Sequence, residues 1–263
     1  MHIEFPTTID DAVQALDGDA TCLAGGTDLM VEVNFGHRHP SRIVALRRID
    51  ELAEISEEWI GAGVTHARLE RSPWPGLSEA ARTVGSPQIR NVGTIGGNIG
   101  TASPAGDALP FLAAVDASIV TRSVNGSREL RWDEFFIGVK RTALMPDELV
   151  VGVKLPLHMP ERQGFSKIGT RSAMVIAIAS VCIARFSDGR TRVALGSVAP
   201  TVTRARRAEE MISEERSPSE AALNEFQRLV SEEASPITDH RATARYRRHG
   251  VGVIARRTLE RLL

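Results

Sequence analysis

The sequence predicts a mixed α+β protein built from two domains. Its 263 residues and 28.5 kDa exceed the size of most single domains and allow a sizeable buried core. Apolar residues alternate in some segments and recur at helical spacing in others, which is typical of mixed strands and helices. Residues 156–163, where prolines and charges interrupt two well-patterned regions, are the expected domain boundary.

The region before this boundary begins with a short amphipathic helix expected at 8–16, where Thr8 supplies a hydroxyl cap. A buried strand at 21–24 then runs into a Gly25-Gly26 turn, and residues 29–33 continue in helical or extended form. The next expected elements are strand 42–46, helix 49–55, strand 59–64, helix 77–84 and a buried helix at 107–115. Strands are then expected at 117–124, 128–132 and 148–155. Asn125-Gly126 predicts a type I′ hairpin turn between the first two.

After the boundary the pattern indicates strands first and helices afterwards. Residues 164–169 fit a strand or a helix, and strands are expected at 174–186 and 191–198 with a hairpin turn at Asp188-Gly189. Helices are expected at 205–213, 219–234 and 246–263. This order predicts a small domain in which a short antiparallel sheet carries helices on one face.

Charge and hydropathy exclude several classes of partner. The net charge of −1 and the isoelectric point near 6.7 give no basic field for nucleic acid or acidic lipid. The first residues lack the basic and apolar regions of a signal peptide, and the longest apolar run, 173–184, is too short to span a bilayer. We therefore expect a soluble cytoplasmic protein with no membrane insertion.

Cysteine and histidine usage predicts no metal centre in this chain. Cys22 and Cys182 are the only cysteines, too few for a disulfide framework or for an iron–sulfur cluster, so both are expected to be small buried hydrophobes. Any such cluster must lie in a partner. His37-Arg38-His39 has no further ligands at suitable spacing and is expected to be a solvated loop.

Two glycine-rich segments predict a nucleotide cofactor. Residues 93–100 contain four glycines, an ordering cost that makes sense where something must approach the backbone closely. Bare amides suit phosphates and flavin edges, and the earlier Gly25-Gly26-Thr27-Asp28 turn exposes amides after a buried strand. One loop could hold a pyrophosphate while the other approaches the flavin.

Other motifs carry less weight. Neither glycine-rich segment has the spacing of a Rossmann or Walker A loop, and no nucleophile elbow is present. Residues 250–255 match Gly-x-Gly-x-x-Ala, but no βαβ unit can follow, so these glycines are expected to start a helix. The arginines near the C-terminus favour a solvated face, with a docking surface for an acidic partner as the alternative; they are residues 241, 245, 247, 248, 256, 257 and 261.

Two motifs together resemble the FAD-binding medium subunit of molybdenum hydroxylases, the family of the xanthine dehydrogenase and carbon monoxide dehydrogenase flavoproteins. They are Leu-Ala-Gly-Gly-Thr-Asp-Leu at 23–29 and Gln-Ile-Arg-Asn-Val-Gly-Thr-Ile-Gly-Gly-Asn at 88–98, followed by Ser103-Pro104 and Asp107. The resemblance implies a two-lobed PCMH-type, vanillyl-alcohol-oxidase-like FAD-binding domain at 1–160, with sublobes of about 1–56 and 57–160. It also implies a carbon-monoxide-dehydrogenase-flavoprotein-like C-terminal domain at 161–263.

The resemblance also assigns binding residues. Those that would wrap the FAD pyrophosphate through backbone amides are Ala24, Gly25, Gly26, Thr27, Asp28 and Leu29. Those that would approach the pyrophosphate and the flavin are Thr94, Ile95, Gly96, Gly97 and Asn98. Ser103 and Asp107 would hydrogen-bond the ribityl or ribose hydroxyls, Val150 would lie against the flavin ring, and Lys167 would be a flavin-side lysine. Ala20 and Thr21 stand where many members carry a basic residue, and Val84 stands where some place an aromatic ring near the adenine.

The function implied is electron transfer without a catalytic side chain. A large subunit with molybdopterin would hydroxylate the substrate, a small subunit with [2Fe-2S] clusters would carry the electrons away, and FAD in this chain would pass them to NAD+, oxygen or a quinone. The assembly would be a heterotrimer or its dimer. Two alternatives are a self-contained FAD-dependent oxidoreductase of the same fold superfamily and a cofactor-free assembly module.

Overall fold

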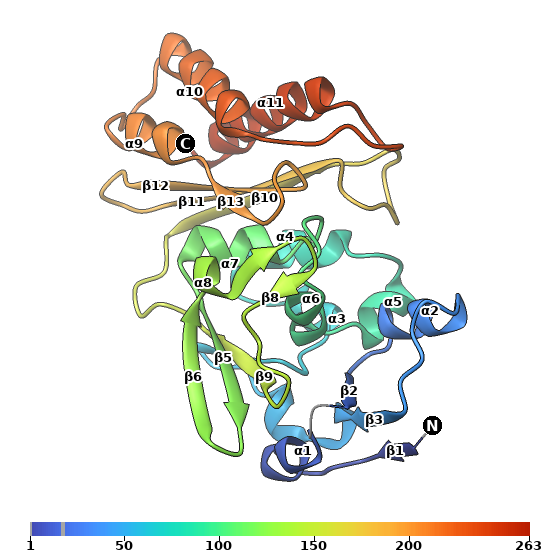
Figure 1. Cartoon of the computed structure of the whole chain (residues 1–263). Coiled ribbons are helices and arrows are strands. Elements are labelled where there is room, and N and C mark those ends of the chain that lie inside the picture. The colour runs from blue at the N-terminus through green and yellow to red at the C-terminus, as the bar shows by residue number, and fades with distance from the viewer. Residues whose placement is uncertain (1, 17–18) are drawn as a thin grey trace.

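The computed structural model describes residues 2–16 and 19–263. Its first sheet has the order β1-β3-β2, with all pairs parallel, and lies at the lower right of Figure 1. The strands are β1 (His2–Glu4), β2 (Ala20–Leu23) and β3 (Arg42–Ala45). The predicted first helix is α1 (Ile9–Ala15), and the Thr8 hydroxyl caps it by accepting the Asp11 amide at 3.1 Å.

The second sheet is antiparallel, with the order β4-β9-β5-β6. Its strands are β4 (Trp59–Gly61), β5 (Ser118–Ser123), β6 (Gly126–Arg131) and β9 (Leu149–Lys154), and β7 (Phe136–Gly138) pairs with β8 (Arg141–Thr142) beside it. The predicted hairpin forms, but the type I′ turn is wrong. Ser123 pairs with Gly126, which places Val124 and Asn125 in the loop, and only Gly126 has a positive φ, 129°.

Short helices connect these sheets. They are α2 (Leu29–Asn34), η1 (Leu46–Arg48), η2 (Asp50–Ala53), α3 (His66–Leu69), α4 (Pro75–Thr83), α5 (Pro87–Val92), α6 (Ile95–Thr101), α7 (Leu109–Val115) and α8 (Trp132–Phe135). The helix expected at 49–55 is only a single 3₁₀ turn, η2. The second glycine-rich segment, expected as a loop, is the helix α6.

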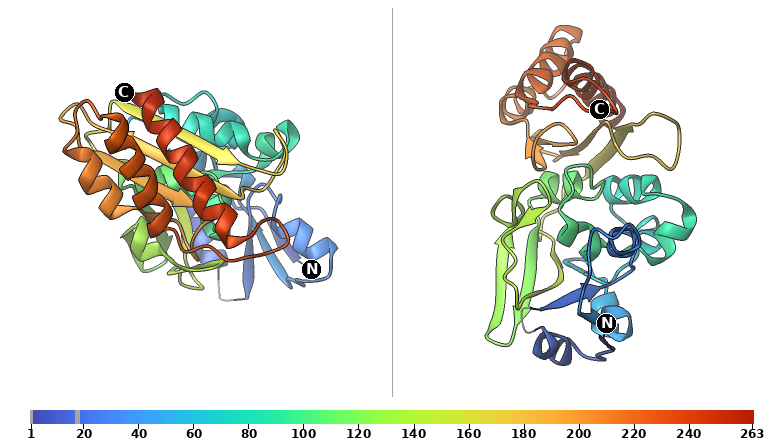
Figure 2. Two further views of the ribbon diagram at one scale, coloured as in Figure 1. Left: turned by 90° about the horizontal axis from the view of Figure 1, so that it is seen from above. Right: turned by 45° about the vertical axis from the view of Figure 1, so that its right-hand side comes forward.

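The C-terminal part confirms the expected antiparallel sheet with helices on one face. Its strands are β10 (Arg162–Ile168), β11 (Ala179–Arg185), β12 (Thr191–Gly196) and β13 (Thr203–Arg204), paired in that order. Its helices are α9 (Arg206–Ser213), α10 (Glu220–Glu233) and α11 (Ala244–Leu262), which lie across one face of the sheet in Figure 1 and in the left view of Figure 2. The other face lies on α4 and α7.

Alternation along β11 buries both faces of this sheet. Cys182 and Ala184 belong to the hydrophobic cluster of the N-terminal sheets, α4 and α7, whereas Val181 and Ile183 belong to the cluster under α9, α10 and α11. Cys182 is fully buried, as expected for a small hydrophobe, and Cys22 is partly buried against the first cluster. The sheet therefore joins the two cores.

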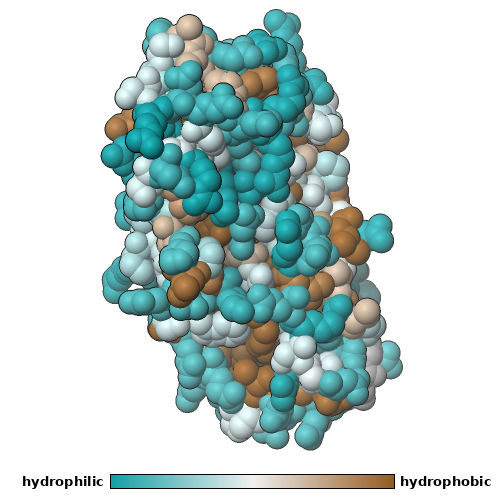
Figure 3. Space-filling view, turned by 90° about the vertical axis from the view of Figure 1, so that its left-hand side faces the viewer, coloured by the Kyte–Doolittle hydropathy of each residue, from teal (hydrophilic) through white to brown (hydrophobic). Residues whose placement is uncertain are grey.

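The C-terminal helix departs from expectation in two ways. Gly250 and Gly252 lie inside α11 rather than at its start. A Cβ on Gly252 would lie 2.2 Å from Ser231 Oγ, so the close approach of this residue requires glycine there. Arg247 is 4% exposed and donates to the carbonyls of Ile178 and Ser197, so it is not part of a solvated face. The face of the molecule in Figure 3 is mostly hydrophilic, and its apolar residues lie in separate groups.

Among the helices of residues 2–16 and 19–263, none combines the length and the apolar character needed to cross a membrane.

Candidate functional site

The two glycine-rich segments meet in space. Gly25 follows β2, and a Cβ on it would lie 1.8 Å from the Val92 carbonyl oxygen, so only glycine permits this backbone contact. A Cβ on Gly93 would in turn lie 3.3 Å from the Thr27 hydroxyl. Residues far apart in sequence therefore form one candidate site.

The first segment presents a run of unpaired backbone amides. None of the N–H groups of residues 25–29 donates to a described residue, while Gly26 has a φ of 71° and its carbonyl accepts the first α2 bond from Met30. Adjacent N–H groups in such a turn form a concave positive surface that suits an anion. We call residues 25–29 the amide run.

The second segment presents bare surface instead of amides. The first three amides of α6 already donate, to the carbonyls of residues 62 and 64 and to the capping hydroxyl of Thr94, which lies 3.0 Å from the Gly97 amide. A Cβ on Gly97 would meet only that hydroxyl, at 3.2 Å, and one on Gly100 would meet nothing within 4 Å. Both glycines are exposed. Gly96 differs, because its Cβ would lie 2.6 Å from Ala62.

Two buried oxygens near this bare surface lack partners. Asn98 Oδ1 and Asp107 Oδ1 accept no hydrogen bond from any described residue. A Cβ on Gly106, the residue before Asp107, would be 3.1 Å from Asn98 Oδ1. Buried acceptors left unpaired are costly, so they suit a ligand that brings hydroxyl donors. The observation fits the ribityl or ribose part of FAD.

Asp107 joins the predicted lysine. Lys167 Nζ lies 2.5 Å from Asp107 Oδ2 and 3.2 Å from the Thr83 carbonyl oxygen, and the Thr83 hydroxyl donates to the same Asp107 oxygen at 3.2 Å. Both charged side chains are buried. Burial raises the pKa of the Asp107 carboxyl above its usual range, and the ammonium of Lys167 opposes that rise. The sequence analysis predicted both residues as binding residues but not their contact, and it did not identify Thr83 as part of the site.

The remaining predicted residues are dispersed around this centre. Ser103 Oγ accepts the Ala105 amide at 3.3 Å, in a turn whose Pro104 carbonyl accepts the Ser197 amide at 2.8 Å. Val150 is buried in β9 within the first core, so its proposed place against the flavin stays a prediction. Ala24, Leu29 and Ile95 complete the predicted set, and Ile95 is fully buried at the start of α6 while the other two are partly buried.

Sequence reasoning missed a link between the ends of the two segments. The Thr101 hydroxyl donates to Asp28 Oδ2 at 3.1 Å, which ties the end of α6 to the start of α2. Thr101 directly follows the glycine-rich segment 93–100, but a pairing across 73 positions has no signature in one sequence.

Sequence reasoning also missed His66. It is 3% exposed, and its amide donates to the Gly93 carbonyl at 2.9 Å. A Cβ on Gly93 would lie 3.4 Å from the ring atom Cδ2 of His66. Burial, and secondarily the charge of Arg90, lowers its pKa from 6.5 to about 4, against an opposing effect of Glu70. The imidazole is therefore neutral near pH 7. A lone histidine has no spacing signal.

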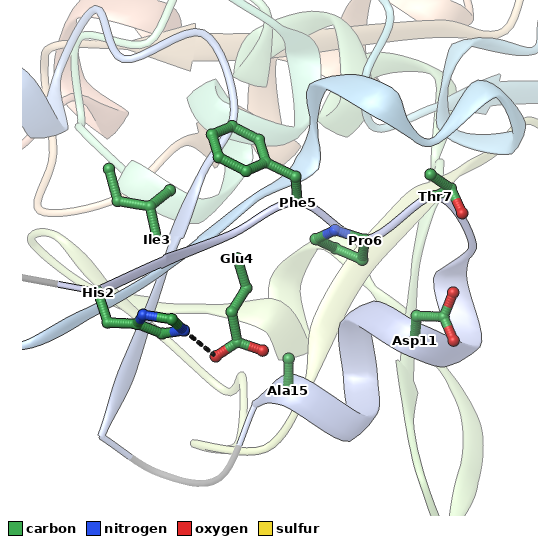
Figure 4. A pocket seen from close by; sticks show the side chains of 8 residues that line it. All are labelled: His2, Ile3, Glu4, Phe5, Pro6, Thr7, Asp11 and Ala15. Carbon is green, nitrogen blue, oxygen red and sulfur yellow. Dashed lines mark ion pairs between the residues drawn. The ribbon is translucent and has the colours of Figure 1, made fainter.

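One surface hollow lies away from this site. It has a volume of about 430 Å³ and is open to solvent, and Figure 4 shows it lined by β1, α1 and the segment between them, with His2 facing Glu4 at 3.9 Å. None of the unpartnered buried polar atoms of the described chain lies among its lining residues. Within residues 2–16 and 19–263 no group of three or more histidine, cysteine or acidic side chains could hold a metal ion.

Comparison with known proteins covers the whole chain. Residues 1–158 match the family model described as the FAD binding domain in molybdopterin dehydrogenase, and residues 165–262 match that of the CO dehydrogenase flavoprotein C-terminal domain. The FAD subunit of nicotinate dehydrogenase from Eubacterium barkeri is 35% identical over 66% of this chain and 64% of its own length. The nicotine 6-hydroxylase medium subunit from Paenarthrobacter nicotinovorans is 31% identical over 97% of this chain and 94% of its own length.

The fold leads to the same family. A chain in the structure of carbon monoxide dehydrogenase from Hydrogenophaga pseudoflava, a form lacking the Mo-pyranopterin moiety of its cofactor, superposes with a TM-score of 0.92 and 30% identity. The match covers 100% of this chain and 96% of that one. The expected PCMH-type fold is thereby confirmed, and the relatives are dehydrogenase subunits. The chain therefore belongs to the FAD-binding medium subunits of the molybdenum hydroxylases, the family of the xanthine and carbon monoxide dehydrogenase flavoproteins.

Proposed function

We propose that FAD binds where the amide run of residues 25–29 meets the bare face of α6, and that this chain uses it to relay electrons within a molybdenum hydroxylase complex. The observation that carries the proposal is the juxtaposition of unpaired amides with exposed glycines across the contact of Gly25 with Val92. Anion-binding amides and a surface free of side chains are what a flavin dinucleotide requires.

Each part of the site has a distinct task in this proposal. The amide run, with the Thr27 hydroxyl, receives the pyrophosphate charge. Gly97 and Gly100 leave room for the cofactor beside α6. Asn98 Oδ1 and Asp107 Oδ1 accept hydrogen bonds from its hydroxyl groups, since neither has a partner among the described residues. Lys167 favours the ionised form of Asp107 in its buried position.

No side chain of this chain needs to act as an acid, a base or a nucleophile. Bound FAD supplies the redox chemistry, and the residues around it bind, orient and exclude water. We propose that the electrons come from [2Fe-2S] clusters in a small partner subunit, after oxidation of the substrate in a large molybdopterin subunit. The acceptor is NAD+, oxygen or a quinone.

The assembly follows from the same proposal. The chain is one of three subunits of a cytoplasmic heterotrimer or its dimer, as the medium-subunit names of its relatives suggest. Within it we propose residues 1–160 as the FAD-binding domain, with sublobes of about 1–56 and 57–160. Residues 161–263 form the C-terminal domain, which supplies Lys167 to the site.

Titration of the flavin-free chain with FAD tests the cofactor assignment. We expect saturable quenching of flavin fluorescence at one FAD per chain, and competition by ADP, which shares the pyrophosphate. Binding of FMN equal to that of FAD would contradict the assignment of the amide run, because FMN lacks the pyrophosphate.

A further inference from the structure

His66 lies where three segments of the candidate site converge. Its amide pairs with the Gly93 carbonyl at 2.9 Å, next to the isolated bridge between Thr65 and Thr94. A Cβ on Gly93 would lie 3.4 Å from His66 Cδ2 and 3.3 Å from Thr27 Oγ1. The imidazole edge and the threonine hydroxyl therefore lie on the same side of Gly93, together with the Ile89 carbonyl oxygen, 3.0 Å from the same Cβ position, and next to the middle of the amide run.

The His66 side chain is buried, and one of its ring nitrogens is unpaired in the described part of the chain. It is 3% exposed, and Nδ1 has no hydrogen-bond partner among the described residues.

The charged groups around His66 leave it neutral. Arg90, on α5, pairs with Glu70, which follows α3, and also donates to the carbonyls of Val84 and Gly85 at 3.1 Å. These two side chains are the charged groups that act on the imidazole, with opposite signs, and burial dominates both. A neutral imidazole carries one N–H and can donate one hydrogen bond.

The Cδ2 edge faces Gly93 and Thr27, and Nε2 is the nitrogen adjacent to Cδ2. A proton on Nε2 could therefore serve a ligand beside Thr27, while the unpaired Nδ1 keeps its lone pair. We propose that His66 is a further binding residue of the dinucleotide site and donates a hydrogen bond from Nε2 to a phosphate oxygen held by the amide run. This inference rests on the proposed function, since it takes the ligand to be the FAD pyrophosphate.

Two conservative variants separate this role from simple packing. The side-chain amide of glutamine reaches the position of Nε2, whereas that of asparagine reaches only the position of Nδ1. We therefore expect His66→Gln to bind FAD and ADP within about threefold of the wild-type chain. His66→Asn should weaken both ligands by about tenfold or more, the effect of losing one hydrogen bond to a charged group.

Leu69→Ala is the matched control, because it removes a fully buried side chain from the same short helix without touching the site. Affinities are measured by FAD fluorescence quenching and by ADP competition, on variants whose folding is checked by circular dichroism. Leu69→Ala should lower the melting temperature but leave the FAD dissociation constant unchanged.

Several results would overturn the inference. They are equal affinities of the Gln and Asn variants, a loss for FAD without a loss for ADP, and a matching loss in Leu69→Ala. Failure of the wild-type chain to bind FAD at all would instead overturn the proposed function, so the two failures are distinguishable.

Discussion

Neighbouring glycines in α6 have opposite roles. Gly96 lies against Ala62, at a distance that leaves no room for a side chain, and its amide donates to the Ala62 carbonyl at 2.8 Å. Gly97, the next residue, has open space in the direction of a side chain apart from the Thr94 hydroxyl. One glycine is therefore required for folding, and the other is free for a ligand.

This contrast predicts different effects of substitution. We expect Gly97→Val to leave the melting temperature nearly unchanged, because surface substitutions usually alter stability by less than about 0.5 kcal/mol. The same variant should lose FAD binding, because the branched side chain fills the bare face. Gly96→Ala should destabilise the chain by about 1–3 kcal/mol, the usual cost of overpacking. Thermal melts and FAD titration of both variants measure these effects.

A Gly97→Val chain that keeps its flavin would show that α6 does not face the cofactor. A Gly96→Ala chain as stable as the wild type would show that the contact with Ala62 relaxes.

His66 predicts how acid affects stability. Its pKa is about 4 in the folded chain and near 6.5 when unfolded, so between these values the unfolded chain binds a proton that the folded chain does not. Stability therefore falls as pH drops through this window. At about pH 5 the cost relative to pH 7 reaches about 2 kcal/mol. Urea unfolding of His66→Gln should show a correspondingly smaller loss than the wild type. Parallel pH profiles would contradict the burial of an uncharged imidazole.

At the scale of elements, local sequence patterns predicted most of the helices but not the helix formed by the second glycine-rich segment. The amphipathic helix α1 followed from apolar spacing and the capping hydroxyl of Thr8, and the three C-terminal helices were also expected. The helix α6 was missed because glycine disfavours helices in isolation. Pairing of its first amides with the 62–64 backbone and with Thr94 stabilises it, and these tertiary bonds have no local signal.

The crossing of α10 and α11 explains the glycines that sequence reasoning placed at a helix start. A Cβ on Gly252 would lie 2.2 Å from Ser231 Oγ and 2.7 Å from the Gln227 carbonyl oxygen, both on α10. A Cβ on Gly250 would meet only the flexible end of Ile168, at 2.8 Å. Close helix packing thus requires glycine at one position and not at the other.

We therefore expect Gly252→Ala to lower the free energy of unfolding by about 1–3 kcal/mol through overpacking. Gly250→Ala should be nearly neutral, because the gain in helix propensity of about 1 kcal/mol offsets the shift of one methyl group. Urea denaturation of the two variants distinguishes them. Equal stability would show that the two helices can separate without cost.

At the scale of the whole molecule, charged contacts fasten the C-terminal sheet to the FAD-binding part. Arg261 of α11 pairs with Glu79 of α4 at 2.8 Å, and Arg192 and Arg204 both reach Asp116. The pair of Lys167 and Asp107 is the most buried of these contacts and lies at the candidate site. The site is therefore complete only when both parts are docked.

Lys167→Met tests this dependence. The substitution leaves Asp107 buried without its cation, which we expect to cost about 3–5 kcal/mol of stability, as for other broken buried pairs. FAD affinity should fall as well. In a double-mutant cycle, Asp107→Asn with Lys167→Met should lose less than the two single variants summed. Additive losses would show that the two side chains act independently.

Sequence reasoning identified Asp107 and Lys167 only through resemblance. The two side chains meet across 60 positions because β10 docks onto α4, and no local pattern in a single sequence encodes that docking. For the same reason Thr83 and His66 were missed, whereas the amide run was found because its glycines stand together. Contiguous features were predictable, and contacts between distant elements were not.

The most direct test of the central claim is native mass spectrometry of the tagged chain, purified gently from its own host. The account predicts one FAD per copy of this chain, in a complex with a small iron–sulfur subunit and a large molybdopterin subunit. A chain that carries FAD but no partners would contradict the relay and favour a self-contained flavoenzyme. A complex of the three subunits in which this chain carries no flavin would contradict the assignment of the cofactor.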